Sequence, residues 1–338
     1  MDEQTLKTTA AAMVARGKGI LAIDESHGTC GKRFEGIGVE CSEETRRAYR
    51  GLLVTAPGVE EAVAGYIMFD ETLRQATDDG TSFVDELKGK GVIPGIKVDT
   101  GAHDLALNPG EKTTEGLDGL RGRLKEYAEL GAGFAKWRSV ITIGDGIPSK
   151  ACIMGNAHGL ARYAALCQEA GIVPMVEPEV LMAGDHSLER CYEVTAETLQ
   201  TLFAQLEEQG VMLEGAILKT SMVLSGADAA EQASHEEVAE MTVKCLKENV
   251  PAELAGVVFL SGGMSAEDAT IRLNMMNKKF ADLAWPLSFS YGRALQAPAL
   301  EAWGKDQADI AGAQGILVHR CKMNGLAAKG EWSEEMEG

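Results

Sequence analysis

Three lysines of this chain stand in or at the end of short apolar runs, where an ammonium group is costly to bury. They are Lys97 in VIPGIKV, Lys136 in GFAKWR and Lys219 in EGAILK. Lysine does covalent work only as the free amine, and its ordinary pKa near 10.4 leaves under about 0.1% of the amine free at pH 7. Apolar walls and neighbouring cations lower a lysine pKa, whereas carboxylates raise it. The pattern indicates a nucleophilic lysine without choosing among the three.

Other polar residues follow the apolar runs in the same manner. In chain order they are Asp24, Asp99, Arg138, Glu177, Glu179, Ser261, Ser290 and Arg293. Side chains alternate along a strand, so we expect Lys136 with Arg138, and Glu177 with Glu179, to point the same way. A single charge after a strand often marks only the exit into solvent. Lysines and carboxylates repeated at the same end of successive strands indicate instead one catalytic mouth.

Two parts of the chain are typical of anion sites. SGGMS at 261–265 and SYGR at 290–293 follow the last two apolar runs, where glycine backbone N–H groups and Arg293 are suited to a phosphate. The segment DESHGTCGKR offers Ser26, Thr29, Lys32 and Arg33 for a second anion. Neither the phosphate loop of nucleotide hydrolases nor the dinucleotide fingerprint is present, which disfavours nucleotide binding.

Eight apolar, β-branched runs recur along the chain, separated by segments with helical periodicity. The runs begin at residues 19, 64, 92, 133, 172, 214, 256 and 286. Ser234 and Glu237 form a predicted capping box before one helix, and Gly210 is a predicted helix stop. The alternation predicts an α/β fold, a (β/α)8 TIM barrel that forms a single domain. We expect residues 1–18 to form a helical N-terminal extension and residues 321–338 a C-terminal tail.

Composition limits the classes of ligand that the protein is expected to bind and the compartment in which it is expected to act. The net charge of −19 and the sequence pI near 4.8 argue against binding to nucleic acid or to anionic membranes. The seven cysteines form no C-x-x-C pair and the six histidines no H-x-x-x-H pair, so we predict no metal site and a reducing compartment. Without a secretory signal or an apolar run of membrane-spanning length, the chain is predicted to be cytoplasmic, or in the plastid stroma as a processed form.

The motifs resemble those of a known family. ILAIDES, TCGKR, GIKVD, FAKWR, VPMVEPE, LEGAILK, FLSGG and SFSYGRALQ stand in the order and spacing of class I fructose-1,6-bisphosphate aldolase, from about residue 5 to about residue 325. The resemblance implies a metal-independent lyase without a cofactor, usually a homotetramer. It implies reversible cleavage of fructose 1,6-bisphosphate to dihydroxyacetone phosphate and glyceraldehyde 3-phosphate, in glycolysis, gluconeogenesis or carbon fixation.

The resemblance also implies a role for each candidate residue. Lys219 matches the lysine that forms an imine with the ketose, and Glu177, with Glu179 and Lys136 beside it, matches the general acid and base of carbinolamine chemistry. Asp24 matches the carboxylate that takes the C4 hydroxyl proton. The residues expected at the C1-phosphate are Ser261, Gly262, Gly292 and Arg293, with Ser290 also a binding residue. Those expected around the other phosphate and the open sugar are Ser26, Thr29, Arg33, Lys97 and Arg138. Two anion sites suit a bisphosphate.

The end of the chain, KGEWSEEMEG, departs from the family pattern, in which a final tyrosine closes over the site in many members. No tyrosine follows Tyr291, so we expect cleavage to survive with slower or water-mediated proton exchange at the enamine. Two alternatives to this function remain. One is another imine-forming barrel with a single phosphate site, such as a transaldolase or a deoxysugar-phosphate aldolase. The other is a nonenzymatic sugar-phosphate-binding protein, which predicts a broken catalytic set.

Overall fold

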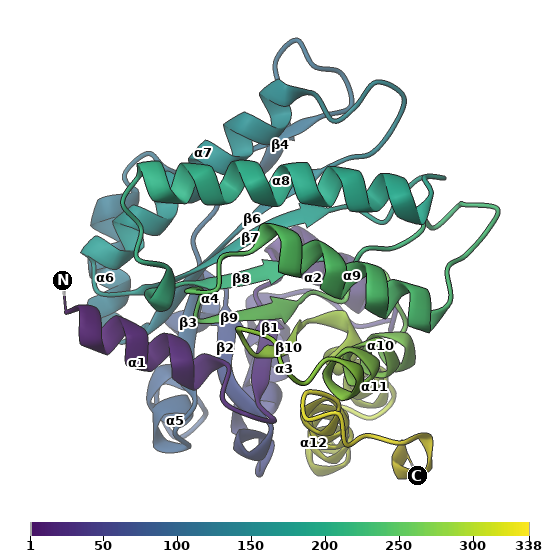
Figure 1. Ribbon diagram of the computed structural model, residues 1–338. Helices are drawn as coiled ribbons and strands as arrows, with labels where there is room; N and C mark the ends of the chain where they lie inside the picture. Colours follow the sequence, from purple (N-terminus) through teal and green to yellow (C-terminus); the bar gives the residue numbers. More distant parts are fainter. Residues whose placement is uncertain (1, 338) are drawn as a thin grey trace.

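Eight parallel strands close into a barrel that helices surround (Figure 1). The computed structural model describes residues 2–337, so Met1 and Gly338, the outermost residues of the two predicted extensions, lie outside it. The barrel strands are β1 (Gly19–Ile23), β2 (Val63–Met68), β3 (Ile93–Lys97), β6 (Phe134–Ile141), β7 (Val173–Val180), β8 (Ile217–Thr220), β9 (Gly256–Phe259) and β10 (Leu287–Tyr291). Around the barrel their order is β1-β10-β9-β8-β7-β6-β3-β2. Each predicted run overlaps one of these strands, which confirms the single-domain (β/α)8 barrel.

Helices that follow the strands cover the outside of the barrel, and one helix precedes the first strand. They are α1 (Glu3–Met13), α2 (His27–Glu35), α3 (Glu43–Thr55), α4 (Asp70–Leu73), α5 (Phe83–Gly89), α6 (Leu120–Leu130), α7 (Lys150–Glu169), α8 (Leu188–Glu208), α9 (His235–Asn249), α10 (Ala266–Lys279), α11 (Arg293–Lys305) and α12 (Ile310–Ala327). Short 3₁₀ turns lie at Val59–Glu61, Leu213–Gly215 and Glu334–Glu337. The predicted capping box of Ser234 and Glu237 is present at the start of α9, and Gly210 follows α8 with φ 68°.

The alternation of side chains along each strand divides the core in two. Inside the barrel, Ile20, Phe134, Met175 and Ile217 pack together with residues of α1, while the intervening strand residues pack outward against the helices. The helix α1 contributes buried Leu6, Ala10 and Met13 to the interior cluster, and thereby covers the amino-terminal end of the barrel. Every second side chain of a strand points inward. The inward positions that follow this apolar layer therefore lie at the carboxyl-terminal end of the barrel, where the polar residues are.

One large ring, that of Phe134, fills the barrel interior because glycines on neighbouring strands leave room for it. A Cβ atom built on Gly95 would lie 2.2 Å from the Phe134 ring, and one built on Gly65 would lie 2.9 Å from it. Phe134 is fully buried between β2 and β3. The ring fills the barrel at the level just below the polar residues of β3 and β6.

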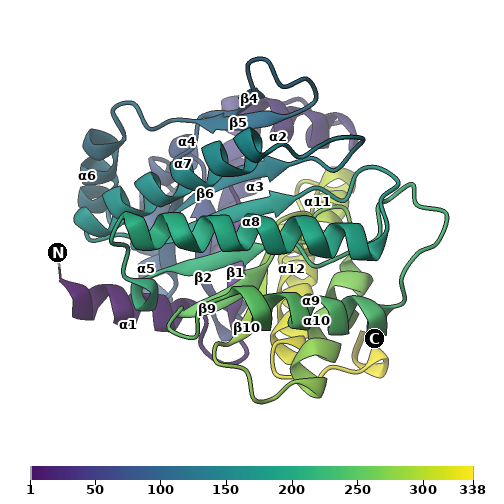
Figure 2. The ribbon, with the colours of Figure 1, turned by 45° about the horizontal axis from the view of Figure 1, so that its top comes forward.

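A two-stranded antiparallel hairpin stands outside the barrel and was not predicted from the sequence. Its strands are β4 (Gly101–Asp104) and β5 (Lys112–Glu115), and it packs beside β6 and α7, away from the C-terminal end of the chain (Figure 2). Leu107 at its tip is fully exposed and has φ 64°. The hairpin is polar and short, and therefore lacks the apolar alternation by which the barrel strands are found.

The C-terminal part of the chain continues as ordered structure beyond the barrel strands. The helix α12 runs through residue 321, where the tail was expected to begin, and the remaining residues fold back on α10 and α12. The Trp332 backbone N–H donates to Asn274 at 3.0 Å, and the Trp332 indole donates to Glu337 at 3.0 Å. Glu337 also pairs with buried Arg320. These contacts fix the tail against two helices.

Filling the space beside Phe134 tests the packing of the barrel interior. We expect Gly95→Ala to lower the free energy of unfolding by about 1 to 3 kcal/mol, because the new methyl group overlaps a buried ring. Gly155 in α7 has no atom within 4 Å of its would-be Cβ, so Gly155→Ala is the matched control and should be neutral or stabilising by up to about 1 kcal/mol. Urea denaturation measures both; equal effects would contradict the packing argument.

Candidate active site

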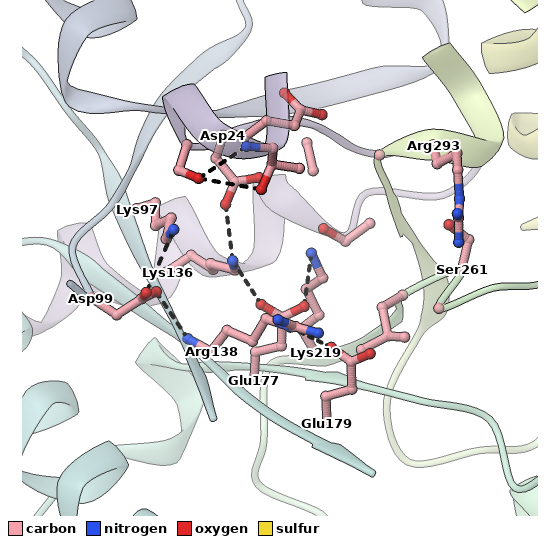
Figure 3. A pocket seen from close by; sticks show the side chains of 18 of the residues that line it. Asp24, Lys97, Asp99, Lys136, Arg138, Glu177, Glu179, Lys219, Ser261 and Arg293 are labelled. Atoms are coloured by element: carbon pink, nitrogen blue, oxygen red, sulfur yellow. Dashed lines mark hydrogen bonds and ion pairs between the residues drawn. The ribbon is translucent and has the colours of Figure 1, made fainter. Parts of the chain in front are cut away.

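One cavity opens at the carboxyl ends of the barrel strands, with a volume of about 330 Å³. Its wall includes all but one of the candidate site residues, from Asp24 in the loop after β1 to Arg293 at the start of α11 (Figure 3). The sixteen are Asp24, Ser26, Thr29, Arg33, Lys97, Asp99, Lys136, Arg138, Glu177, Glu179, Lys219, Ser261, Gly262, Ser290, Gly292 and Arg293. Lys32, also offered by the sequence for an anion, lies outside this lining. We call this cavity the mouth. The structure brings the sixteen residues together, while their chemical roles remain predictions.

Lys136 is the centre of the buried charges in the mouth. It lies two positions beyond Phe134 on β6, and its side chain is 5% exposed. Its Nζ donates to Asp24 Oδ2 at 2.9 Å and lies 3.0 Å from Glu177 Oε2 (Figure 3). Among residues 2–337, Glu177 Oε2 has no partner with hydrogen-bond geometry, so that contact is an ion pair only. Two carboxylates from other strands therefore share one ammonium.

Lys219 lies on the other side of Glu177. It occupies the third position of the four-residue strand β8, two positions beyond Ile217 in the barrel interior, and its side chain is 5% exposed. Lys219 Nζ lies 3.1 Å from Glu177 Oε1. At this distance a proton can pass directly between the amine and the carboxylate. Of the three lysines, Lys219 is the one that pairs with Glu177 alone.

A second layer of charges surrounds this group. Arg138, two positions after Lys136, pairs with Glu179, and the Arg138 backbone N–H donates to Asp99 Oδ2 at 3.2 Å. Lys97 lies 3.6 Å from Asp99 and 5.9 Å from the centre of the Phe69 ring. Each cation of this layer therefore has a carboxylate partner in the mouth before any ligand arrives.

The close packing of these groups fixes their charges. Burial alone would raise the pKa of the Asp24 carboxyl, but the ammonium groups of Lys136 and Lys219 outweigh burial and hold this pKa far below its ordinary range. The same balance lowers the pKa of Glu177. Burial alone would lower the pKa of Lys136, but Asp24 and Glu177 raise it far above its ordinary value. At neutral pH, Lys136 is therefore a permanent cation between two ionised carboxylates.

Glycine-rich turns and helix N-termini form the rim of the mouth. Gly262 and Gly263 have φ of 21° and 96°, which side-chain-bearing residues rarely adopt, and Arg293 is the first residue of α11. On another side, Ser26 caps the N-terminus of α2 and lies 3.2 Å from the Thr29 hydroxyl. Backbone N–H groups at the starts of two helices thus accompany the arginines, an arrangement suited to anions.

The balance of charge in the mouth is opposite to that of the whole chain. Its lining holds six cations, Arg33, Lys97, Lys136, Arg138, Lys219 and Arg293, and five carboxylates, Asp24, Glu25, Asp99, Glu177 and Glu179. The chain as a whole carries −19. An anionic ligand is therefore attracted locally although the rest of the surface repels it.

Sequence reasoning missed part of this lining. Glu25 lies between two predicted residues and within the motif ILAIDES, but neither strand alternation nor the family likeness gave it a role. The backbone around Gly101 and Ala102 comes from the unpredicted hairpin, for which the only signal was the turn sequence Asn108, Pro109 and Gly110. Within residues 2–337 no cluster of three histidine, cysteine or carboxylate side chains has the arrangement of a metal site. No helix of the described chain is long and apolar enough to cross a membrane.

Comparison with known proteins identifies the family. Residues 5–338 match the family described as "Fructose-bisphosphate aldolase class-I". The chain belongs to the class I fructose-bisphosphate aldolase family. A probable fructose-bisphosphate aldolase class 1 of Xanthomonas campestris is 61% identical over 333 residues, which are 98% of this chain and 99% of the relative. The cytosolic fructose-bisphosphate aldolase 6 of Arabidopsis thaliana is 50% identical over 97% of this chain and 91% of its own length.

A solved aldolase structure has the same fold along the whole chain. The aldolase of Plasmodium falciparum, solved in complex with TRAP and a small-molecule inhibitor, superposes with a TM-score of 0.96 at 45% identity, covering 98% of this chain and 95% of the other. The family likeness read from the motifs is thereby confirmed, and the barrel is the aldolase barrel.

The lowered pKa of Asp24 predicts how its contribution to stability depends on pH. Its stabilisation is fully present above the pKa of an unfolded aspartate, near 3.9, and is lost as the pH falls through the lower folded value. We expect Asp24→Asn to cost about 2 kcal/mol at pH 6, with Glu177 still pairing Lys136, and the difference from wild type to shrink from about pH 4 downward. Urea midpoints at several pH values measure this; a difference that grows toward low pH would contradict it.

Proposed function

We propose that this protein is a fructose-bisphosphate aldolase that cleaves fructose 1,6-bisphosphate through an imine on Lys219. The proposal rests above all on one geometry: Lys219 Nζ lies 3.1 Å from an ionised Glu177, in a mouth with anion-binding groups on separate parts of its rim. The residues fit both ends of a doubly phosphorylated ketose. A barrel aldolase with one phosphate site would not need both sets, and a binding protein would not need the buried lysine and carboxylates.

The first step joins the substrate to the lysine. Glu177 takes a proton from the Lys219 ammonium across the 3.1 Å contact, and the free amine attacks C2 of the open-chain ketose. The resulting carbinolamine loses its hydroxyl as water after Glu177 returns a proton to it, which leaves a protonated imine. In the empty site the nearby cations outweigh burial and hold the pKa of Glu177 below its ordinary value, so both transfers require that the bound substrate weaken those contacts.

The second step breaks the C3–C4 bond. Asp24 accepts the proton of the C4 hydroxyl, the C4 oxygen becomes the aldehyde oxygen of glyceraldehyde 3-phosphate, and the C3–C4 electron pair moves toward the imine nitrogen to form an enamine. Asp24 is a weak base in the empty site, since Lys136 is the strongest of the cations that lower its pKa. Substrate oxygens that take over part of the hydrogen bonding of Lys136 would raise this pKa and make the transfer feasible.

The last step regenerates the lysine. The enamine takes a proton at C3, water adds to the imine carbon, and dihydroxyacetone phosphate leaves Lys219 as the free amine. The protonated imine is the electron sink throughout, the part that a metal plays as Lewis acid in other aldolases. Ser261, Gly262, Gly292 and Arg293 are proposed to hold the C1-phosphate, with Ser290 nearby. Ser26, Thr29, Arg33, Lys97 and Arg138 are proposed to hold the other phosphate and the sugar chain.

Proton exchange at C3 is proposed to depend on groups other than the tail. The tail of this chain has no tyrosine and is bound to α10 and α12 through Trp332 and Glu337. A segment held in this way is not free to close over the mouth while those contacts persist. A water molecule within reach of Glu177 is then the proposed proton carrier.

The family supports further proposals about the context of the enzyme. We infer a homotetramer of 36.0 kDa subunits that acts in the cytoplasm in glycolysis or gluconeogenesis, with carbon fixation in a plastid as the alternative setting. The proposed partner is the sugar bisphosphate alone, without nucleic acid or membrane, and no added cofactor beyond the covalent imine on Lys219.

Borohydride trapping tests the covalent intermediate. With fructose 1,6-bisphosphate present, borohydride should reduce the imine and inactivate the enzyme, with the added mass mapped by peptide analysis to Lys219. Lys219→Arg should lower kcat by at least about 10⁴-fold, because a guanidinium forms no imine. Activity should survive EDTA. Labelling at Lys97 or Lys136, with Lys219 unmodified, would reverse the assignment of roles.

Isotope exchange tests the proposed role of the tail. Release of tritium from the hydroxymethyl carbon of dihydroxyacetone phosphate, which is C3 of the bisphosphate, should be slow relative to cleavage of the bisphosphate. Truncation after Lys329 should leave the ratio of the two rates within about threefold, because the tail is held away from the mouth. The control is a family member that ends in tyrosine, measured under the same conditions. Equally fast exchange in both proteins would refute the expectation.

A further inference from the structure

Glu25 lines the mouth next to Asp24, but none of the proposed catalytic steps uses it. Its side chain is 8% exposed and is held by donors from three helices. Oε1 accepts from Arg33 Nη1 of α2 and, at 2.8 Å, from Gln296 Nε2 of α11. Oε2 accepts from Arg50 Nη2 of α3 at 2.9 Å. One carboxylate therefore fixes the direction of Arg33, which is itself part of the mouth.

Arg50 is a buried cation that the mouth does not expose. Its side chain is 1% exposed, and it is absent from the lining of the cavity. Its Nη1 donates to Thr72 Oγ1 at 2.8 Å, and its Nη2 also reaches the backbone carbonyl of Glu25 at 3.2 Å. Among residues 2–337, Glu25 supplies the one carboxylate within ion-pair distance of Arg50. Because an unpaired buried charge is strongly destabilising, the negative charge of Glu25 is needed to neutralise Arg50.

Counting charges shows what Arg50 changes. Arg33 and Glu25 alone would form a neutral pair, which attracts an anion weakly. With Arg50 on the far oxygen of the same carboxylate, the group of three carries one net positive charge, and Arg33 is its only cation that lines the mouth. Because Arg50 and Glu25 are buried, solvent and salt screen this effect little.

We propose that Arg50 is a positioning residue for the anionic end of the substrate that Arg33 binds. It neutralises Glu25, so that Glu25 can hold the Arg33 guanidinium in place without cancelling its attraction for a phosphate. Arg50 acts through Arg33 and touches no substrate. The inference rests on the proposed function, because it takes a sugar phosphate as the anion.

A charge-balanced pair of variants tests the proposal. In Arg50→Met, Glu25 keeps Arg33 and Gln296 as partners, so no carboxylate is stranded, but the net charge is gone. We expect KM for fructose 1,6-bisphosphate to rise about tenfold with kcat within about threefold. The double variant Glu25→Gln/Arg50→Met restores the net charge, while the amide oxygen at position 25 can still accept from Arg33. Its KM should return to within about threefold of wild type.

The double variant separates charge from structure. A purely structural role for Arg50 predicts that removing Glu25 as well leaves KM as high or higher, because more buried contacts are lost. That result would overturn the proposal. Arg50→Lys, which keeps the positive charge, should have a KM close to that of wild type; a KM as high as in Arg50→Met would also overturn it.

Arg320 provides a matched control for lost stability. Arg320 is buried, pairs with Glu337 and donates to Thr270 Oγ1 at 2.8 Å. Arg50 makes the corresponding contacts with Glu25 and Thr72. Arg320, however, lies in α12 next to α10, outside the lining of the mouth. Arg320→Met should lower the melting temperature about as much as Arg50→Met and leave KM unchanged. An equal rise in KM would assign the effect to stability and refute the proposal.

Phosphate binding measured without turnover distinguishes a failure of the proposed function from a failure of the proposed role of Arg50. Calorimetric titration with inorganic phosphate should show weaker binding to Arg50→Met than to wild type and recovery in the double variant. If the wild type does not cleave fructose 1,6-bisphosphate but this order of phosphate affinities holds, the proposed function fails and the role of Arg50 stands. If cleavage is normal and all variants bind phosphate equally, only the role of Arg50 fails.

Discussion

The ammonium of Lys136, shared between Asp24 and Glu177, is the interaction on which the other features of the mouth depend. Two carboxylates this deeply buried would repel each other and take up protons without a cation between them. With the cation in place both remain ionised, and Glu177 can face Lys219 with an oxygen able to receive a proton. The cost of burying three charges is met only while their distances hold, which requires a rigid scaffold.

The barrel interior supplies that rigidity. Phe134 sits in the space left by Gly65 and Gly95, and the inward positions of the same strands become polar only two residues later. Apolar packing and charge pairing thus lie in successive layers of one set of strands. The outer cations, Arg138 and Lys97, repeat the arrangement with their own carboxylates, so the mouth keeps an excess of positive charge without a mobile cation among its deepest groups.

The barrel and nearly the whole lining of the mouth could be predicted from the sequence because local sequence patterns indicate both. The apolar runs gave the strands, and a period of two placed Lys136 with Arg138 and Glu177 with Glu179 on the inner face. Their chemical roles came from the family likeness, since strand periodicity does not separate Lys219 from the other lysines. The pairings themselves join residues far apart in the chain, 112 positions in the case of Lys136 with Asp24, and leave no local trace.

Other features carried no usable pattern. The β4–β5 hairpin is polar on both faces, so its strands lack the alternation that reveals buried ones. Glu25 is important through the helices that converge on it, α2, α3 and α11, and that convergence exists only in the folded chain. The path of the tail was equally hidden, because its anchors, Asn274 and Arg320, belong to helices that look ordinary in sequence.

The position of α1 has a consequence for how ligands enter and leave the enzyme. The buried face of α1 closes the amino-terminal end of the barrel, and apolar side chains fill the interior next to it. Within residues 2–337, a ligand can therefore reach Lys219 only through the mouth. In the proposed mechanism the ketose is tethered to Lys219 at the opposite, open end of the barrel, so the aldehyde half leaves first through that end. The half bound to the lysine follows only after water has entered by the same route and hydrolysed the imine.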